Sequence, residues 1–298
     1  MSLNPSQLRG TFTAVVTPFN RDGSLDLGAL DALVDRQLDG GITGLVPCGT
    51  TGEAATLSAE ERERVIRRVV ARAGGRAQVI AGTGANSTAA TVENQQRAKD
   101  AGADAALVVT PYYNKPTPEG LVRHYAAIAD AVDFPTILYN VPGRTGCDMK
   151  PETVARVSML RGVMGIKEAT GDLDRVGALR VSTRPDFVLL SGDDATAVPF
   201  VLLGGDGVIS VTSNVAPGEM VQMIQAALAG RVTDARRLHD RLRPLFAALF
   251  WEANPIPVKA ALAIRQQLAE CYRLPLCEMS PEPRRRLETI LREGGWSS

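Results

Sequence analysis

Gly162-Val163-Met164-Gly165-Ile166-Lys167 is an apolar run that ends on a single lysine. A short apolar run of this kind predicts a buried β-strand. Because burial of an ammonium group is costly, Lys167 must reach solvent at the strand tip, pair with a carboxylate, or be buried for a chemical purpose. Burial favours the neutral amine, which is the form that attacks a carbonyl carbon. We therefore treat Lys167 as a candidate nucleophile.

Further short apolar runs flank this one, separated by stretches with helical periodicity. We expect eight strands, at residues 12–16, 43–47, 78–82, 105–109, 136–140, 162–167, 187–191 and 207–211. Repeated strand–helix units at spacings of roughly thirty residues or less predict an α/β protein, a parallel sheet closed into a (β/α)8 TIM barrel. An open, doubly wound sheet is the alternative, but eight strands would make it unusually wide.

The β pattern stops near residue 231, and three helical stretches follow. We expect them at residues 231–250, 255–271 and 281–293, the last with Ser280 as N-cap, Pro281 at its first position and Gly294-Gly295 as its end. The predicted organisation is a catalytic barrel over residues 1–230 and a C-terminal three-helix appendage over residues 231–298. We expect this helical domain to pack on the barrel or on another subunit.

Charge and hydropathy exclude several classes of protein. Basic and acidic residues balance at 33 each, which argues against a nucleic-acid partner. The sequence has no apolar stretch of the ~18 residues that a membrane span needs. The first residues, Met1-Ser2-Leu3-Asn4-Pro5, lack the pattern of a secretory signal, so we expect a cytoplasmic protein.

Cofactor and metal motifs are not evident either. The four cysteines form no Cys-x-x-Cys pair, and the two histidines, His124 and His239, lie far apart in the sequence. Residues 82–87, Gly-Thr-Gly-Ala-Asn-Ser, miss the last glycine of the dinucleotide pattern. We expect neither a cofactor nor a bound metal ion.

Unusual polar residues follow the predicted strands, at the barrel end where such enzymes carry their chemistry. Residues 49–53, Gly-Thr-Thr-Gly-Glu, place two hydroxyls between glycines, which suits a small carboxylate; a plain tight turn is the alternative. Tyr139 ends a strand beside Lys167 and is either a proton relay or core. Arg144 is either a fork for a substrate carboxylate or part of a surface ion pair. Of the adjacent Tyr112 and Tyr113, we expect at most one to reach the site.

These segments together resemble the dihydrodipicolinate synthase family, which lies within the N-acetylneuraminate lyase superfamily of Schiff-base aldolases. The resemblance runs collinearly from about residue 10 to the C-terminus. It is carried by residues 49–53, 112–114, 139–145, 165–171, 191–194, 207–211 and 254–259.

The resemblance implies a 4-hydroxy-tetrahydrodipicolinate synthase, a lyase that condenses pyruvate with L-aspartate 4-semialdehyde in diaminopimelate and lysine biosynthesis. Lys167 is the implied Schiff-base residue. Tyr139, Thr50 and Tyr113 match the family's proton relay, with Tyr113 reaching across a dimer interface. The implied substrate-binding residues are Thr50 and Thr51 for the pyruvate carboxylate, Arg144 for the semialdehyde carboxylate, and Ile209 and Gly192 at the pocket wall.

The resemblance also implies an assembly, because relatives are usually homotetramers built from two tight dimers. Relatives inhibited by lysine bind it with a serine, histidines and a glutamate, where this chain has Ala54, Ala59, Arg62 and Ala90. Asn86 and Tyr112 remain. We therefore expect weak or absent inhibition by lysine.

Two other functions stay open at this stage. One is a related pyruvate-dependent aldolase that acts on a sugar-derived 2-keto acid, since a fold does not fix a substrate. Arg144 favours the amino-acid aldehyde, because sialic-acid lyases generally lack that arginine. The other is a non-catalytic barrel that binds a keto acid, against which the complete set of Lys167, Tyr139, Thr50, Tyr113 and Arg144 argues.

Overall fold

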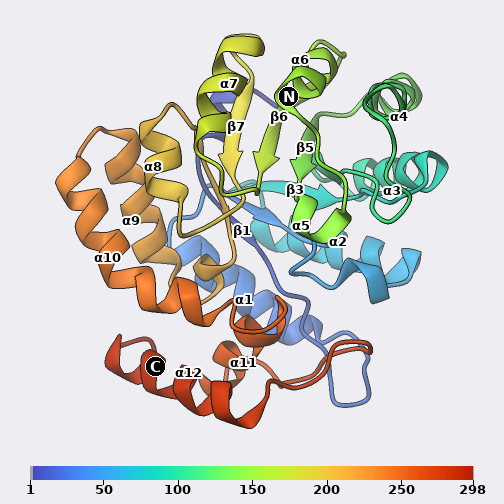
Figure 1. Ribbon diagram of the computed structural model, residues 1–298. Coiled ribbons are helices and arrows are strands. Elements are labelled where there is room, and N and C mark those ends of the chain that lie inside the picture. The colour runs from blue at the N-terminus through green and yellow to red at the C-terminus, as the bar shows by residue number, and fades with distance from the viewer. Residues whose placement is uncertain (1–2, 298) are drawn as a thin grey trace.

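The computed structural model describes residues 3–297 and shows a closed barrel of parallel strands ringed by helices (Figure 1). The strands are hydrogen-bonded in chain order, and β8 closes onto β1. They are β1 Gly10–Ala14, β2 Gly44–Val46, β3 Gln78–Gly82, β4 Ala105–Val109, β5 Thr136–Asn140, β6 Val163–Glu168, β7 Val188–Ser191 and β8 Gly207–Ser210. The expected (β/α)8 barrel is confirmed.

The expected strand positions differ from the observed ones mainly at the start of the chain. β1 lies two residues earlier than predicted, because Val15 and Val16 are buried but continue into the loop beyond the sheet. The other strands agree within one residue at each end. Burial alone could not mark the end of β1, since a buried loop and a buried strand look the same in the sequence.

Helices alternate with the strands and cover the outside of the barrel. They are α1 Leu27–Asp39, α2 Ala59–Ala73, α3 Thr88–Asp100, α4 Pro118–Ala131, α5 Pro142–Thr145, α6 Pro151–Ser158, α7 Asp174–Ser182, α8 Ala197–Leu202 and α9 Pro217–Leu228, with the 3-10 helices η1 Pro5–Leu8, η2 Ala54–Thr56 and η3 Thr212–Asn214. A capping box starts α2, where the Ser58 hydroxyl accepts from the Glu61 N–H and the Glu61 carboxylate accepts from the Ser58 N–H.

Two apolar layers hold this arrangement together. Phe12, Ile80, Leu107, Ile137 and Leu190 are among the residues that fill the inside of the barrel. A larger cluster lies between the strands and the surrounding helices. Because successive residues of a strand point to opposite faces, strands buried on both faces read as the continuous apolar runs seen in the sequence.

The C-terminal tail has three helices, α10 Val232–Ala248, α11 Ile256–Ile264 and α12 Pro281–Glu293. The second is shorter than the predicted 255–271, because the chain leaves the helix after Ile264 and Gln266 adopts a positive φ of 56°. In Figure 1, α11 and α12 lie together at the bottom of the view. The proposed domain boundary at residue 230 remains a prediction.

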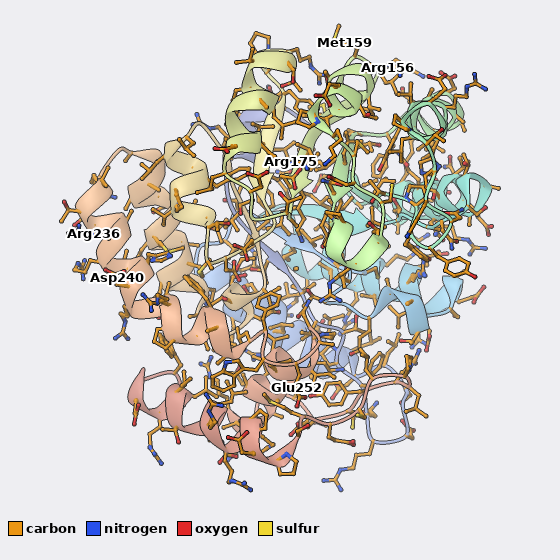
Figure 2. All side chains as sticks on the ribbon, viewed as in Figure 1. Arg156, Met159, Arg175, Arg236, Asp240 and Glu252 are labelled. Atoms are coloured by element: carbon orange, nitrogen blue, oxygen red, sulfur yellow. The ribbon has the colours of Figure 1, made fainter. Side chains whose placement is uncertain are left out.

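Each face of α10 has a different role. Arg236 and Asp240 lie on its outer side, away from the barrel (Figure 2). Ala235, Leu238 and Leu242 on the opposite side are buried and belong to the cluster that also contains the residues of α9. Within residues 3–297, none of the helices has both the length and the apolar character needed to cross a membrane.

Candidate active site

Lys167 is buried at the carboxyl end of β6, with 6% of its surface exposed. Its register partner on β5 is Tyr139, and the Lys167 Nζ lies 4.4 Å from the centre of the Tyr139 ring. Both residues line a cavity of about 130 Å³. No carboxylate among the described residues forms an ion pair with Lys167, so the structure favours a buried amine that faces a small cavity.

Gly192, directly after β7, leaves the space that the Lys167 side chain occupies. A Cβ atom at position 192 would lie 2.5 Å from the Ala169 Cβ and 3.0 Å from the Lys167 Cε. Gly192 also lines the cavity, and its N–H donates to the Glu168 carbonyl at 2.7 Å. The glycine is therefore required by close packing at the amine.

The loop after β2 forms part of the wall of the same cavity. Thr50 and Thr51 both line the cavity. The loop is a tight turn, since the Gly52 N–H donates to the Gly49 carbonyl at 3.1 Å. Within residues 3–297, the backbone N–H groups of Thr50 and Thr51 have no acceptor, so they are available to a bound anion. The turn and the anion-binding interpretations are thus compatible.

Asn254, which precedes α11, is a site residue that sequence reasoning did not assign. Its Nδ2 donates to the Thr51 Oγ1 at 2.9 Å, and its side chain lines the cavity. Its Oδ1 is buried and has no hydrogen-bond partner among the described residues. A polar residue in the segment Asn254–Lys259, inside an otherwise apolar tail motif, was the available signal.

Arg144, on α5, lies at the entrance to this site. It lines the cavity of Lys167 and an adjoining cavity of about 360 Å³. Thr50, Tyr139 and Asn254 are shared by the two cavities. The side chain of Arg144 is exposed and, among residues 3–297, has no carboxylate partner. A surface ion pair, the alternative interpretation, is therefore not what the structure shows.

Two candidates are not brought to the amine within this single chain. Tyr113 is 88% exposed, has a positive φ of 74°, and does not line either cavity. Its neighbour Tyr112 lines the larger cavity. Ile209 is packed inside the barrel on β8 and lines neither cavity, whereas Val211 lines the smaller one. The roles of Tyr113 and Ile209 remain predictions.

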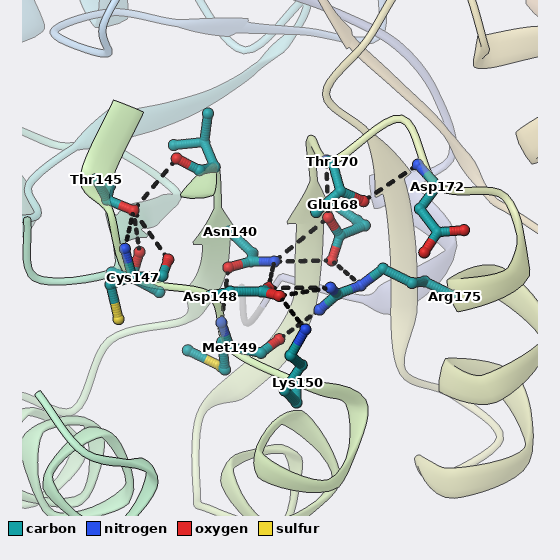
Figure 3. Close-up of polar contacts among 12 residues, drawn as sticks. Asn140, Thr145, Cys147, Asp148, Met149, Lys150, Glu168, Thr170, Asp172 and Arg175 are labelled. Atoms are coloured by element: carbon teal, nitrogen blue, oxygen red, sulfur yellow. Dashed lines mark hydrogen bonds and ion pairs between the residues drawn. The ribbon is translucent and has the colours of Figure 1, made fainter. Parts of the chain in front are cut away.

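A polar network joins the ends of β5 and β6 to the segment after α5 and to α7 (Figure 3). The Asn140 Nδ2 donates to the Glu168 Oε2 at 3.1 Å and to the Asp148 Oδ1 at 3.0 Å. Burial raises the pKa of Glu168, and the Arg175 charge offsets this only partly. Burial would also raise the pKa of Asp148, but hydrogen bonds from Lys150, Asn140 and Arg175 hold it at about 2. Asp148 is therefore a carboxylate at neutral pH.

The part of the chain that the structure describes has no evident metal-binding site. No three His, Cys, Asp or Glu side chains in residues 3–297 lie close enough together to hold an ion. The arrangement offers instead a nucleophilic amine, a phenol beside it, free amide donors and an arginine at the entrance. These groups suit covalent chemistry on a keto acid.

Comparisons with known proteins agree with this chemistry. The model of the dihydrodipicolinate synthetase family matches residues 7–294. A 4-hydroxy-tetrahydrodipicolinate synthase of Pseudomonas putida (strain W619) is 54% identical over 97% of this chain and 99% of its own length. The solved dihydrodipicolinate synthase of Acinetobacter baumannii, chloride-inhibited and complexed with pyruvate, is 46% identical, with a TM-score of 0.95 over 97% of this chain and 99% of that one.

A second solved structure is similar over the same part of the chain. The dihydrodipicolinate synthase of Cyanidioschyzon merolae with lysine bound is 39% identical, with a TM-score of 0.94, and the match covers 97% of this chain and 99% of that one. These similarities confirm the resemblance seen in the sequence. The chain belongs to the dihydrodipicolinate synthetase family.

Proposed function

We propose that this chain is a 4-hydroxy-tetrahydrodipicolinate synthase, a lyase that condenses pyruvate with L-aspartate 4-semialdehyde in diaminopimelate and lysine biosynthesis. One observation carries the proposal: the Lys167 amine, buried and without a carboxylate partner among residues 3–297, faces a small cavity beside Tyr139. The identity of 54% to a named synthase over nearly the whole chain supports the same activity.

The first half of the reaction joins Lys167 to pyruvate. The neutral Nζ attacks pyruvate C2, and loss of water gives an imine. Removal of a proton from the pyruvate methyl group gives a nucleophilic enamine. Tyr139 is the nearest phenol and, with Thr50, transfers these protons. The free N–H groups and hydroxyls of Thr50 and Thr51 hold the pyruvate carboxylate.

The second half uses the entrance of the site. The enamine carbon attacks the aldehyde carbon, and the aldehyde oxygen takes up a proton. The amine of the semialdehyde then attacks the imine carbon and displaces Lys167 as the ring closes. Arg144 receives the semialdehyde carboxylate, because its guanidinium lies at the junction of the two cavities without a competing carboxylate among the described residues. Gly192 completes the pocket wall, whereas Ile209 packs inside the barrel and lines neither cavity.

Tyr113 enters the proposal through the assembly. Its exposed side chain is the expected state of a group that serves the site of a neighbouring copy. We place it in the relay of the partner subunit, in a homotetramer made of two tight dimers. The enzyme works in the cytoplasm and uses neither nucleic acid nor membrane as a partner.

Weak or absent inhibition by lysine is part of the proposal. Ala54, Arg62 and Tyr112 line the larger cavity, and the Arg62 Nη2 donates to the Ala54 carbonyl at 2.6 Å. Glu53 also lines this cavity, but its Oε1 lies 2.6 Å from the Lys259 Nζ. Because Glu53 is already paired, it does not offer a carboxylate to the ammonium groups of a bound lysine. Turnover measured during an L-lysine titration should stay nearly constant, and inhibition at micromolar concentration would contradict this part.

The second substrate is tested by turnover. Purified enzyme should convert pyruvate with L-aspartate 4-semialdehyde and leave a sugar-derived 2-keto acid unchanged; the opposite preference would assign the chain to another aldolase. Arg144→Ala should keep imine formation while kcat/KM for the semialdehyde falls about 10- to 100-fold, the loss expected for a charged hydrogen bond. Arg123→Ala, an exposed arginine on α4 paired with Glu119, is the matched control.

A further inference from the structure

The residues that follow Tyr139 and Lys167 are themselves partners across the sheet. Asn140 follows Tyr139 on β5, Glu168 follows Lys167 on β6, and both pairs are in register. Because successive side chains of a strand point to opposite faces, Tyr139 and Lys167 face the barrel interior while Asn140 and Glu168 face outward. The hydrogen bond of 3.1 Å from the Asn140 Nδ2 to the Glu168 Oε2 therefore joins β5 and β6 on the outer face of the barrel, one residue after Tyr139 and Lys167.

Arg175 closes the network from helix α7. Its Nε lies 3.3 Å from the Glu168 Oε2, and its Nη1 donates to the Asp148 Oδ1 at 2.9 Å. Its Nη2 donates to the Met149 carbonyl at 2.6 Å. In Figure 3 the guanidinium lies between the two carboxylates. Arg175 thus ties the tip of β6 to the segment that follows α5.

Arg144 lies on α5, directly before that segment. The Asn140 Oδ1 accepts from the Met149 N–H at 2.9 Å, so the chain returns to β5 a few residues after Arg144. The segment 141–149 therefore begins next to Asn140 and is hydrogen-bonded back to the Asn140 side chain at its end. Asn140 and Glu168 are almost fully buried, and none of the four network side chains lines either cavity.

We propose that Asn140, Glu168, Asp148 and Arg175 form a positioning network with two separable effects on the reaction. The Asn140–Glu168 contact keeps the Lys167 amine beside the Tyr139 phenol. The Asp148–Arg175 contact keeps Arg144 at the entrance, where it receives the second substrate. The inference rests on the proposed function and adds to it the residues that set its geometry.

A physical argument separates this role from simple stabilisation. Burying a charged cluster brings little net stability compared with apolar side chains of the same size. Such a cluster does fix distances, because each hydrogen bond has a narrow range of geometry. A misplacement of about 1 Å near reacting atoms costs about 100-fold in rate.

Two nearly isosteric variants test the two effects separately. In Glu168→Gln, the rate at which pyruvate gives a hydride-trappable imine should fall about 10- to 100-fold, while KM for the semialdehyde stays near the wild-type value. In Asp148→Asn, imine formation should stay near the wild-type rate, while KM for the semialdehyde rises about tenfold. Rates are measured well below each variant's midpoint of thermal unfolding.

Asp206→Asn is the matched control. Asp206 accepts from Arg180 and from the Leu189 N–H, so it forms a similar network at the amino ends of β7 and β8, away from the site. This variant should lose thermal stability and keep both kinetic values.

The outcomes are distinguishable from those of the proposed function. Variants that lose stability but keep wild-type imine rates and KM would overturn the network's role, because a merely structural cluster behaves in that way. If Glu168→Gln does not fold, the kinetics of Asp148→Asn alone test the proposal. The Asp148 side chain lies at the partly exposed edge of the network, so this variant is expected to fold. Failure of the wild type to form any imine would contradict the proposed function itself.

Discussion

At the scale of single residues, the site depends on the space around one amine. Lys167 extends into a cavity whose wall is formed by Gly192, Ala169 and Tyr139. The φ angle of Gly192 lies outside the left-handed region that favours glycine. The glycine is therefore explained by close packing around it and not by an unusual backbone conformation. In the proposed mechanism, imine formation at Lys167 therefore depends on a glycine that itself does no chemistry.

Gly192→Ala should abolish most of the reaction with pyruvate. The added methyl would lie 2.5 Å from the Ala169 Cβ and 3.0 Å from the Lys167 Cε, so the amine must shift. We expect the rate of imine trapping to fall about 100-fold, in line with a displacement of ~1 Å. Gly177→Ala is the control, because nothing lies within 4 Å of the added Cβ on α7. Equal trapping rates in the two variants would refute the packing argument.

The sequence predicted this part of the site because the topology collects strand ends at one rim. Lys167, Tyr139, Thr50, Thr51, Arg144 and Gly192 all line the cavities, as expected. Asn254 was missed, since its approach to Thr51 depends on how the tail packs and no local pattern encodes that. Tyr113 lines neither cavity of the single chain, so its role in a partner's site stays a proposal.

At the scale of elements, the tail is attached to the loop after β2 by a buried ion pair. The Lys259 Nζ on α11 lies 2.6 Å from the Glu53 Oε1, and neither side chain is exposed. The same Nζ donates to the Thr17 carbonyl at 3.1 Å and lies 4.4 Å from the centre of the Phe19 ring. Burial lowers the pKa of Lys259, which the Glu53 charge only partly offsets.

Lys259→Met should strongly destabilise the fold. It leaves the Glu53 carboxylate buried without its cation, which typically costs about 3–5 kcal/mol. The loss is measured as the change in free energy of unfolding in urea, with Arg67→Ala, an exposed helical pair with Glu63, as the control. Adding Glu53→Gln should restore part of the stability. A loss no greater than that of the control would contradict this account.

His124 should make stability depend on pH. Burial lowers its pKa from 6.5 to about 4, so the folded protein keeps the ring neutral where the unfolded chain binds a proton. The contribution of His124 to stability is therefore fully present above pH 6.5 and falls as the pH drops towards 4, by about 3 kcal/mol in total.

The measurement compares unfolding of the wild type and His124→Asn from pH 7 to 4.5. The difference between their free energies of unfolding should shrink as the pH falls, and a constant difference would show that His124 does not titrate in this window. Glu61 and Asp148 also make stability depend on pH, because their pKa values are held at about 2 and their contributions are lost at lower pH. Both proteins contain these two groups, so their contributions cancel in the difference between the two free energies of unfolding.

Element boundaries show where sequence reasoning stops. The capping box of α2 and the Pro281 start of α12 were predictable, because their signals lie within a few residues. The end of α11 at Ile264 was not, since the residues that follow have helical composition and only the positive φ of Gln266 marks the break.

At the scale of the whole molecule, the barrel surrounds the amine and the tail covers part of its rim. Phe250 and Asn254, between α10 and α11, line the cavity of Lys167. Periodicity predicted the barrel and the helical tail, but it could not show that the tail contributes to the site. That contribution follows from packing between segments about 200 residues apart in the sequence.

The assembly is tested by complementation. If Tyr113 serves a partner's Lys167, the inactive variants Tyr113→Phe and Lys167→Ala should regain activity when mixed, unfolded and refolded together. A random 1:1 mixture of dimers places both native residues at about a quarter of the sites. Recovery of turnover to that level supports a shared site, and no recovery in mixed dimers confirmed by native mass spectrometry would sink the idea.

Hydride trapping tests the central claim most directly. Protein incubated with pyruvate, reduced with borohydride and mapped by mass spectrometry of its peptides should carry one pyruvate-derived adduct, on Lys167, and Lys167→Ala should carry none. An adduct on the other buried lysine, Lys259, or no adduct at all, would contradict the account.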